Sequence, residues 1–311
     1  MSKTNFVVNP SLTAIAIAYT NAAFVADKVL PRLPVGGRQY KWKKYNTEER
    51  FTIPDTSVGR TGRPNEIEFG FTDMDGSVKD FGLEDPIPNE DVLQAKNTIG
   101  FNPKGHATEM LSELVALGRE KRVADLVFNP NTYGAGYKEV ITGTDQWNDK
   151  ANAKPIVQLL DALETPMVRP NVMTLGSNAA LQLRQHPDVI KAYNGTLGDQ
   201  GLVPLAYLRE LLELEEIIVG RAKYNAANKG QEMNLSKLWG NHCSLIYRNR
   251  NARPQGGVTF GWTAAWEGRV AMTRQDDNIG LRGGVRVRVG ESVNEQIVCD
   301  DVAYFLENVV A

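Results

Sequence analysis

Three histidines and several grouped carboxylates are the residues of this chain whose types could support catalysis or metal binding. His106-Ala-Thr-Glu109 holds half of a metal-binding helix motif, but the second histidine of a His-Glu-x-x-His site is missing. His186 and His242 lie far apart in the sequence, and no serine or cysteine has a recognisable nucleophile setting. We therefore predict no catalytic residues, and we interpret His106 as an exposed histidine at the start of a helix.

Two further segments match ligand sites only in part. Asp73-Met-Asp75-Gly76, followed by Glu84, is similar to a calcium loop, but the glycine stands at the fourth position instead of the sixth. A solvated turn is the simpler interpretation. Gly280-Leu-Arg-Gly-Gly284 could contact phosphate, yet the strand–Gly-x-Gly-x-x-Gly–helix context is absent, which favours a loop before a strand. We expect no metal, no cofactor and no enzymatic activity.

Composition excludes several classes of protein. The chain of 311 residues has 35 Lys and Arg against 37 Asp and Glu, so its net charge of -2 argues against tight nucleic-acid binding. It has no apolar run of about 18 residues that could span a membrane, and no secretory signal pattern. Cys243 and Cys299 have neither a zinc spacing nor a disulfide framework, so we expect both to be free and buried.

The elements that must position these residues include one unusual segment, Pro34 to Pro88. Strand patterns stand at its two ends, Arg38–Tyr45 and Ser77–Leu83, and glycines, prolines and charges fill the interval. Irregular excursions of this length are uncommon inside compact domains, and a two-stranded arm is marginally stable by itself. We therefore expect this arm to lie on another copy of the protein.

The charges of the arm admit three interpretations. Lysines alternate with aromatic residues at its start, a pattern that could bind single-stranded nucleic acid by stacking and basic charge. Acidic residues share the arm, and a mixed-charge surface fits a complementary protein surface better, although a solvated edge strand also remains open. The candidate inter-subunit contacts are Arg38, Tyr40, Lys41, Trp42, Lys43, Lys44, Glu48, Glu49, Arg60, Arg63, Glu66 and Glu68.

Helices are predicted on both sides of the arm. The hydrophobic pattern predicts one helix from Pro10 to Val29, and Glu84–Pro88 reads as a rigid bridge. The strongest helix runs from about His106 to Phe128 and would be about 34 Å long, enough for the spine of a domain.

The second half of the chain alternates helices and strands and then becomes rich in strands. Residues 155–250 predict a compact α/β unit, with Ser177 as a helix N-cap and Glu216–Tyr224 as one strand. Near the end, Arg286 and Arg288 alternate with valines, which indicates a strand with one apolar and one basic face.

This order of elements resembles the HK97-fold major capsid proteins of tailed bacteriophages. Three stretches carry the resemblance: the arm from about 38 to 83 placed before the long helix, the segment Pro170–Ile190, and the end of the chain, Glu295–Val310. The second is similar to part of the axial domain of such coat proteins. The third is similar to the strand that closes their peripheral domain. Among these families, the sequence most resembles the coat proteins of Mu-like transposable phages.

The resemblance implies an α+β, HK97-like capsid fold with an extended N-arm, a β-hairpin E-loop, a peripheral domain with a long spine helix, and an axial α/β domain. Residues 1–31 would form the N-terminal arm, and residues 32–88 the E-loop that lies over a neighbouring subunit. Residues 89–154 and 251–311 would form the peripheral domain, with the spine helix at 106–128. Residues 155–250 would form the axial domain.

The implied function is structural: a major capsid protein that self-assembles into pentamers and hexamers of an icosahedral head around double-stranded DNA. The implied partners are a portal, decoration proteins, a protease, the packaged DNA through non-specific contact, and a separate scaffolding protein, because the arm begins by residue 38 and leaves no room for a scaffolding segment before it. We expect assembly in the host bacterial cytoplasm, a final place in the virion, and no membrane.

Three other functions remain open. An encapsulin-type nanocompartment shell shares the implied fold and would co-purify with an enzyme cargo. An α/β enzyme could use the unit at 155–250, but it lacks an acid–base set. A phage tail-tube or baseplate protein is disfavoured by the long predicted helix.

Overall fold

The computed structural model describes residues 5–45, 51–67, 70–96, 101–195, 198, 200–228 and 230–311. The helices are α1 (Pro10–Ala18), α2 (Ala26–Val29), α3 (Asn89–Lys96), α4 (Pro103–Val127), α5 (Pro155–Glu164), α6 (Ser177–Arg184), α7 (Pro187–Asn194) and α8 (Leu205–Leu211). The strands are β1 (Val7–Val8), β2 (Arg32–Pro34), β3 (Gln39–Tyr45), β4 (Phe71–Ser77), β5 (Lys79–Pro88), β6 (Lys138–Val140), β7 (Val172–Gly176), β8 (Glu216–Gly220), β9 (Lys223–Asn225), β10 (Leu235–Lys237), β11 (Cys243–Ile246), β12 (Gly261–Asp276), β13 (Gly284–Ile297) and β14 (Ala303–Glu307).

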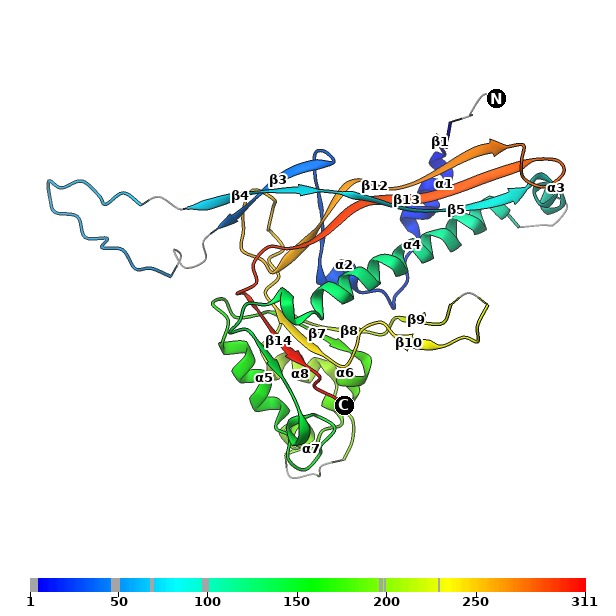
Figure 1. The fold of residues 1–311 in the computed structure, drawn as a ribbon. Helices are drawn as coiled ribbons and strands as arrows, with labels where there is room; N and C mark the ends of the chain where they lie inside the picture. Colours follow the sequence, from blue (N-terminus) through cyan, green and yellow to red (C-terminus); the bar gives the residue numbers. More distant parts are fainter. Residues whose placement is uncertain are drawn as a thin grey trace.

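The upper part of the molecule is a long sheet with the long helix α4 along one face (Figure 1). Its strand order is β1-β12-β13-β5, and β2 pairs with β12. Val287 and Val289 of β13 are buried against α1 and α4, while the alternate residues Arg286 and Arg288 are only partly buried and form ion pairs with Glu84. The predicted strand with one apolar and one basic face is therefore confirmed.

The segment after the arm differs from the prediction. Ser77–Leu83 is not one strand, because β4 and β5 meet at the buried Val78. Glu84–Pro88 is not a bridge but the second half of β5, with Pro86 opposite Arg286. Prolines are tolerated here because β5 is an edge strand and its outer side needs no ladder hydrogen bonds.

The lower part of the molecule is built on a second sheet, in the order β6-β14-β11-β7-β8, with α5, α6, α7 and α8 packed around it (Figure 1). β14 lies between β6 and β11 in this sheet, with Phe305 opposite Ser244. Residues 251–311, which the resemblance assigns to the peripheral domain, therefore contribute strands to both sheets. β14 belongs here because Leu306 and Val309 are buried in the hydrophobic core of the α/β unit.

Two predicted elements are each divided in the structure. Glu216–Tyr224 forms β8 and β9, which belong to different sheets. The chain leaves the second sheet after Gly220, where a Cβ would lie 2.1 Å from the Trp239 ring. The helix predicted over Pro10–Val29 is α1 and α2, because the Asn21 side chain accepts a hydrogen bond from the Ala23 N–H at 2.9 Å and holds a turn between them.

A buried carboxylate joins three parts of the chain. Glu120 of α4 is fully buried, and its oxygens accept hydrogen bonds from the backbone N–H groups of Val25 and Ala26 at 2.8–2.9 Å. They also accept a bond from Trp239 Nε1 at 2.7 Å, and Trp239 lies between β10 and β11. Burial raises the pKa of Glu120. This carboxylate thus connects the N-terminal segment, the long helix and the loop that enters the second sheet.

The neighbouring Arg119 is also buried and binds a second set of groups. It forms an ion pair with Asp27, and its Nη2 donates to Thr263 Oγ1 of β12 at 3.0 Å. Asp27 also accepts from Arg32 Nε at 2.8 Å, and Arg32 pairs with the buried Glu291 of β13 at 2.9 Å. The network therefore fixes α2 and β2 against the first sheet.

Helix caps in the second unit correct one prediction and explain one histidine. Ser177 is the first residue of α6, and the N-cap is Gly176, which has no side-chain capping bond. His186 is the N-cap of α7: its Nδ1 accepts from the Asp188 N–H at 3.2 Å. Burial lowers the pKa of His186, which keeps Nδ1 free to accept.

We expect Glu120→Ala to lower the free energy of unfolding by about 3 kcal/mol, because it leaves three buried donors without an acceptor. Urea denaturation followed by circular dichroism measures the change. Glu109→Ala is the matched control, since Glu109 is exposed on the same helix and should change stability by less than about 0.5 kcal/mol. Equal effects of the two substitutions would contradict the assigned role.

The ion pairs of Asp27 predict an acid-sensitive stability. Burial alone would raise the pKa of Asp27, but Arg119 and Arg32 outweigh it and lower the pKa below 3.8. The stabilisation is present above the unfolded-state pKa and is lost as pH falls through the folded-state pKa. We expect Asp27→Asn to have a shallower loss of unfolding free energy than the unmodified protein between about pH 4 and pH 2. Parallel curves would exclude Asp27 as a source of this dependence.

Candidate assembly surfaces

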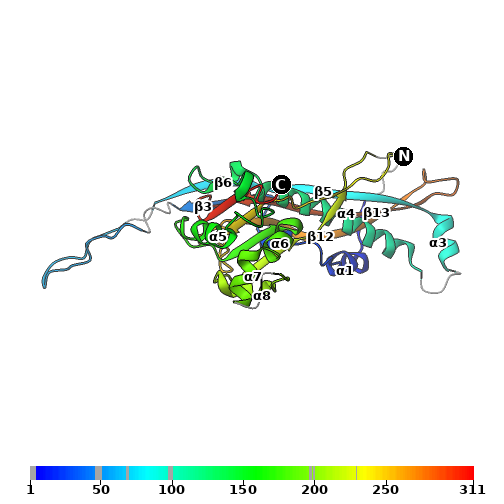
Figure 2. The same cartoon turned by 90° about the horizontal axis from the view of Figure 1, so that it is seen from below.

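The arm extends from the body as a hairpin followed by a long loop (Figures 1 and 2). β3 and β4 pair antiparallel from Gln39↔Ser77 to Tyr45↔Phe71. Beyond them, residues 51–67 form no helix or strand and are exposed along their whole length. Several apolar side chains of the arm are exposed, namely Phe51, Ile53, Val58, Ile67, Phe71 and Met74. Ile53 has the largest exposed fraction of these, 94 %.

The base of the arm belongs to the core of its own subunit. Trp42 is only 7 % exposed and lies in the main core cluster. The Tyr40 ring lies 5.9 Å from Trp262, and its hydroxyl donates to Gln296 Oε1 at 2.5 Å and accepts from Asn294 Nδ2 at 2.8 Å. Trp42 therefore has little surface left for a neighbour, and its selection as an inter-subunit contact stays a prediction. Tyr40 is half-buried in the same way.

Most of the predicted basic contacts also have partners within their own subunit. Arg38 pairs with Asp80, and Lys41 lies 4.0 Å from Asp75 across the hairpin. Lys43 Nζ lies 3.3 Å from the centre of the Phe71 ring, and Lys44 lies 3.6 Å from Asp300. Arg60, Arg63 and Glu66 lie on the exposed loop. Glu48, Glu49 and Glu68 lie outside the described residues. Whether any of these residues contacts a neighbour stays a prediction.

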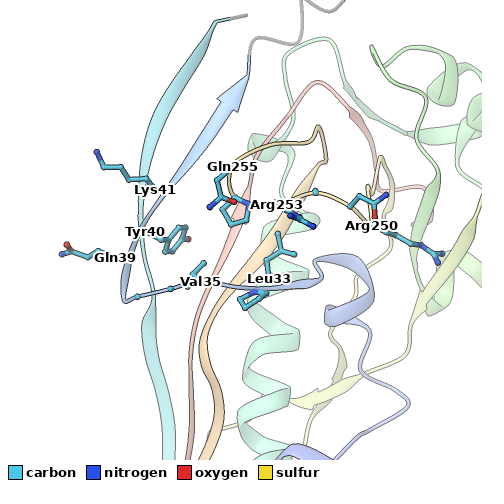
Figure 3. Close-up of a pocket in the computed structure, with 14 residues that line it drawn as sticks. Leu33, Val35, Gln39, Tyr40, Lys41, Arg250, Arg253 and Gln255 are labelled. Carbon is cyan, nitrogen blue, oxygen red and sulfur yellow. The ribbon is translucent and has the colours of Figure 1, made fainter.

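A groove of about 810 Å³ lies beside the base of the arm (Figure 3). Leu33, Val35 and Tyr40 supply apolar surface, and Lys41, Arg250 and Arg253 supply positive charge. The loop that carries the two arginines also supports the arm, because Pro254 O accepts from the Lys43 N–H at 3.0 Å. The residues that line the groove include no acid–base pair. We interpret the loop beside it as a support that fixes the direction of the arm.

The residues that could do chemistry are dispersed over the structure. His106 is exposed in the first turn of α4, as predicted, and His242 Nδ1 accepts from the Asn308 N–H at 3.0 Å. Among the described residues, no group of three or more His, Cys, Asp or Glu side chains could hold a metal ion. Cys243 and Cys299 are free and buried, as predicted, and burial raises the pKa of Cys299 to about 11.

The two partial ligand motifs have structural roles. Asp73 and Asp75 lie on β4 opposite Lys43 and Lys41, so the predicted solvated turn is wrong and the segment is a strand. Glu84 pairs with Arg288. Gly280 and Gly283 lie in the loop before β13, as predicted, with positive φ values of 57° and 70°, and Gly284 is the first residue of β13. Within the described part of the chain, no helix is both long and apolar enough to cross a membrane.

Sequence reasoning missed two exposed surfaces outside the arm. One is the two-stranded β9/β10 hairpin, with Met233 and Leu235 exposed. The other is the outer face of α5, with Val157 and Leu160 exposed. The amphipathic pattern of α5 predicts a helix correctly but does not say which of its apolar residues stay uncovered, because that depends on the packing of the whole unit.

We expect Trp42→Ala to lower the free energy of unfolding of the isolated subunit by about 3–5 kcal/mol, because it leaves a cavity in the core. Ile53→Ala is the matched variant on the arm and should change it by less than about 0.5 kcal/mol. Urea denaturation at low protein concentration measures both. A large effect of Ile53→Ala in a monomer would show that the loop packs on its own subunit.

Comparison with known proteins gives two curated relatives, both phage coat proteins, and no family model matches. The chain is 51% identical over 311 residues to the "Major capsid protein" of Pseudomonas phage JBD67, with 100% of both chains covered. It is 30% identical over 283 residues to the "Major capsid protein" of Burkholderia phage BcepMu, covering 87% of this chain and 88% of the relative.

Solved structures share the same arrangement of elements. A phage-related protein from Bordetella bronchiseptica RB50 matches with a TM-score of 0.77 and 22% identity over 98% of both chains. The capsid of cyanophage P-SCSP1u matches with a TM-score of 0.55 and 10% identity, covering 89% and 85%. A virus-like particle from Pyrococcus furiosus matches with a TM-score of 0.53 and 11% identity, covering 96% and 98%. At these identities the structures establish the fold alone.

Proposed function

The chain belongs to the family of bacteriophage major capsid proteins and has the HK97-like capsid fold, and from this premise we propose that it is the coat subunit of an icosahedral head built from pentamers and hexamers around double-stranded DNA. The protein has a structural role in the virion. Both curated relatives are phage coat proteins, which favours this function over a nanocompartment shell and over an α/β enzyme.

The arm is the observation that carries the proposal. Residues 51–67 leave the body, have no core of their own and expose apolar side chains such as Phe51 and Ile53. Exposed apolar groups gathered on one extended segment mark an interaction surface. In a closed shell every subunit has a neighbour, so each arm can cover a second copy and be covered in turn. Repetition then multiplies modest contacts into a stable assembly.

The separation into two sheets supports a division of the proposed coat subunit into two domains. The first sheet with α3 and α4 would form the peripheral domain, and the second sheet with α5–α8 would form the axial domain at the centre of each ring. The axial domain then includes β6 and β14 in addition to residues 155–250. Contacts between unlike faces of successive subunits close into rings of five or six when the rotation closes.

The near-neutral charge of the chain fits a shell that encloses DNA without binding it tightly. A portal, decoration proteins, a protease and a separate scaffolding protein are the further partners that we propose, with assembly in the cytoplasm of the bacterial host.

We expect replacement of residues 51–67 by a short Gly-Ser turn to leave the monomer folded and to abolish stable shells, because β3, β4 and Trp42 stay in place while the exposed part of the arm is lost. Negative-stain electron microscopy and sedimentation measure assembly, and thermal melting checks the fold. Arg60→Ala with Arg63→Ala is the companion variant that keeps the loop and removes only its positive charge. Normal shells from the loop replacement would refute the role of the arm.

A further inference from the structure

The β9/β10 hairpin projects from one flank of the second unit, on the side opposite α5 (Figure 1; yellow loop in Figure 2). Its strands pair only with each other, in the register Leu235↔Asn225 and Lys237↔Lys223. A two-stranded ribbon of this kind is marginally stable in water unless a face is covered.

The two faces of the hairpin differ. Tyr224 and Ser236 are partly buried, and Lys121 of α4 lies 5.5 Å from the Tyr224 ring, so this face turns towards the body of the same subunit. The alternate residues form the opposite face, which is open: Lys223, Asn225, Met233, Leu235 and Lys237 are all exposed. Met233 is 70 % exposed and Leu235 is 54 % exposed, so the open face presents apolar surface next to the pair of lysines Lys223 and Lys237.

The charge of this open face lacks a counterpart. Lys223 and Lys237 stand directly opposite each other, and like charges in this position destabilise a strand pair. Neither lysine, nor the nearby Arg221, forms an ion pair within the described residues. An anionic partner placed against the face would remove the repulsion and cover the apolar side chains at the same time.

A face of matching chemistry lies on the opposite flank of the same unit. α5 exposes Val157, Leu160, Asp161 and Glu164, which share one side of the helix by their spacing. Val157 is 54 % exposed. Asp161 forms no ion pair within the described residues, whereas Glu164 pairs with Arg169 at 2.8 Å. The exposed Glu139 of the edge strand β6 pairs in register with Leu306, and Glu139 and Asp161 both act on Tyr304, so Glu139 extends the acidic part of this face.

We propose that the open face of the β9/β10 hairpin docks on the α5 face of a second copy of this chain. The two faces are complementary in charge, both carry apolar side chains, and they lie on opposite flanks. That is the placement that a head-to-tail contact around a ring requires. The inference rests on the proposed function and adds the surfaces by which neighbouring axial domains meet. Packaged nucleic acid is the competing occupant, and exposed Met233 and Leu235 suit a protein surface better than phosphates.

A charge exchange tests the contact. Lys237→Glu and Asp161→Lys should each reduce the fraction of subunits that sediment as rings or shells by about tenfold, because each places like charges together. The double variant Lys237→Glu with Asp161→Lys should recover assembly, since every interface then holds an inverted pair. Both residues are exposed, and melting curves of the monomers check that they fold. Recovery supports the proposal, and independent additive losses would overturn it.

Cysteine cross-linking gives a second readout that does not depend on charge. Leu235→Cys with Val157→Cys should form disulfide-linked oligomers under mild oxidation, while the natural cysteines are buried and should not react. Leu281→Cys with Val157→Cys is the matched control, since Leu281 is exposed at the far tip of the β12/β13 hairpin and should give no ladder.

The outcomes separate this inference from the proposed function. If the unmodified protein forms rings or shells but neither the rescue nor the cross-link occurs, the inference fails and the proposed function stands. If the unmodified protein forms no assembly with or without its scaffolding partner, the proposed function fails and the inference fails with it. If Lys223→Glu with Lys237→Glu lowers only the DNA content of intact shells, the hairpin faces nucleic acid and the proposal is overturned.

Discussion

The buried carboxylate of Glu120 is the interaction on which the arrangement of the subunit depends. A charged or protonated carboxyl group in the core is costly unless its oxygens are hydrogen-bonded, and here three donors from two distant segments meet it. Because these donors belong to the start of α2 and to Trp239, the long helix becomes the element against which both sheets are aligned. Arg119, one residue earlier, does the same for β2 and the first sheet.

This rigid junction gives the exposed surfaces a defined direction. The arm leaves the first sheet at a base held by Trp42 and Val78, and the β9/β10 hairpin leaves the second unit close to Trp239. A surface that binds a neighbour must be presented within a narrow range of angles, since head-to-tail contacts form rings only when the rotation between subunits closes. The buried polar network therefore fixes the orientation of the arm and the hairpin, and the exposed apolar side chains on these segments supply the surface for contact with a neighbour.

Local patterns in the sequence predict much of this fold. The long helix, the arm strands, the alternating valines of β13 and the short helices of the α/β unit follow from hydrophobic spacing, prolines and caps, which act within a few residues. What the sequence did not reveal depends on distant partners. β14 looks like any buried strand, and only its pairing with β6 and β11 assigns it to the second sheet. The neighbouring lysines make Trp42 look exposed in the sequence, but in the structure its ring packs in the main hydrophobic core. The exposed faces of the β9/β10 hairpin and of α5 were missed because local sequence does not show which apolar residues the rest of the subunit leaves uncovered.

The strand pairings have a consequence for how the protein is made. Arg32 pairs with Thr263, Lys79 with Val293, and Lys138 with Phe305, so neither sheet is complete until its partner strands from the last part of the chain have been synthesised. Contacts this distant in sequence slow folding and leave strand edges exposed on the nascent chain. The first 250 residues on a ribosome would have an arm but no finished body to support it. A subunit whose sheets close last can join a lattice only once translation has passed β14, which keeps incomplete chains out of the shell without any separate check.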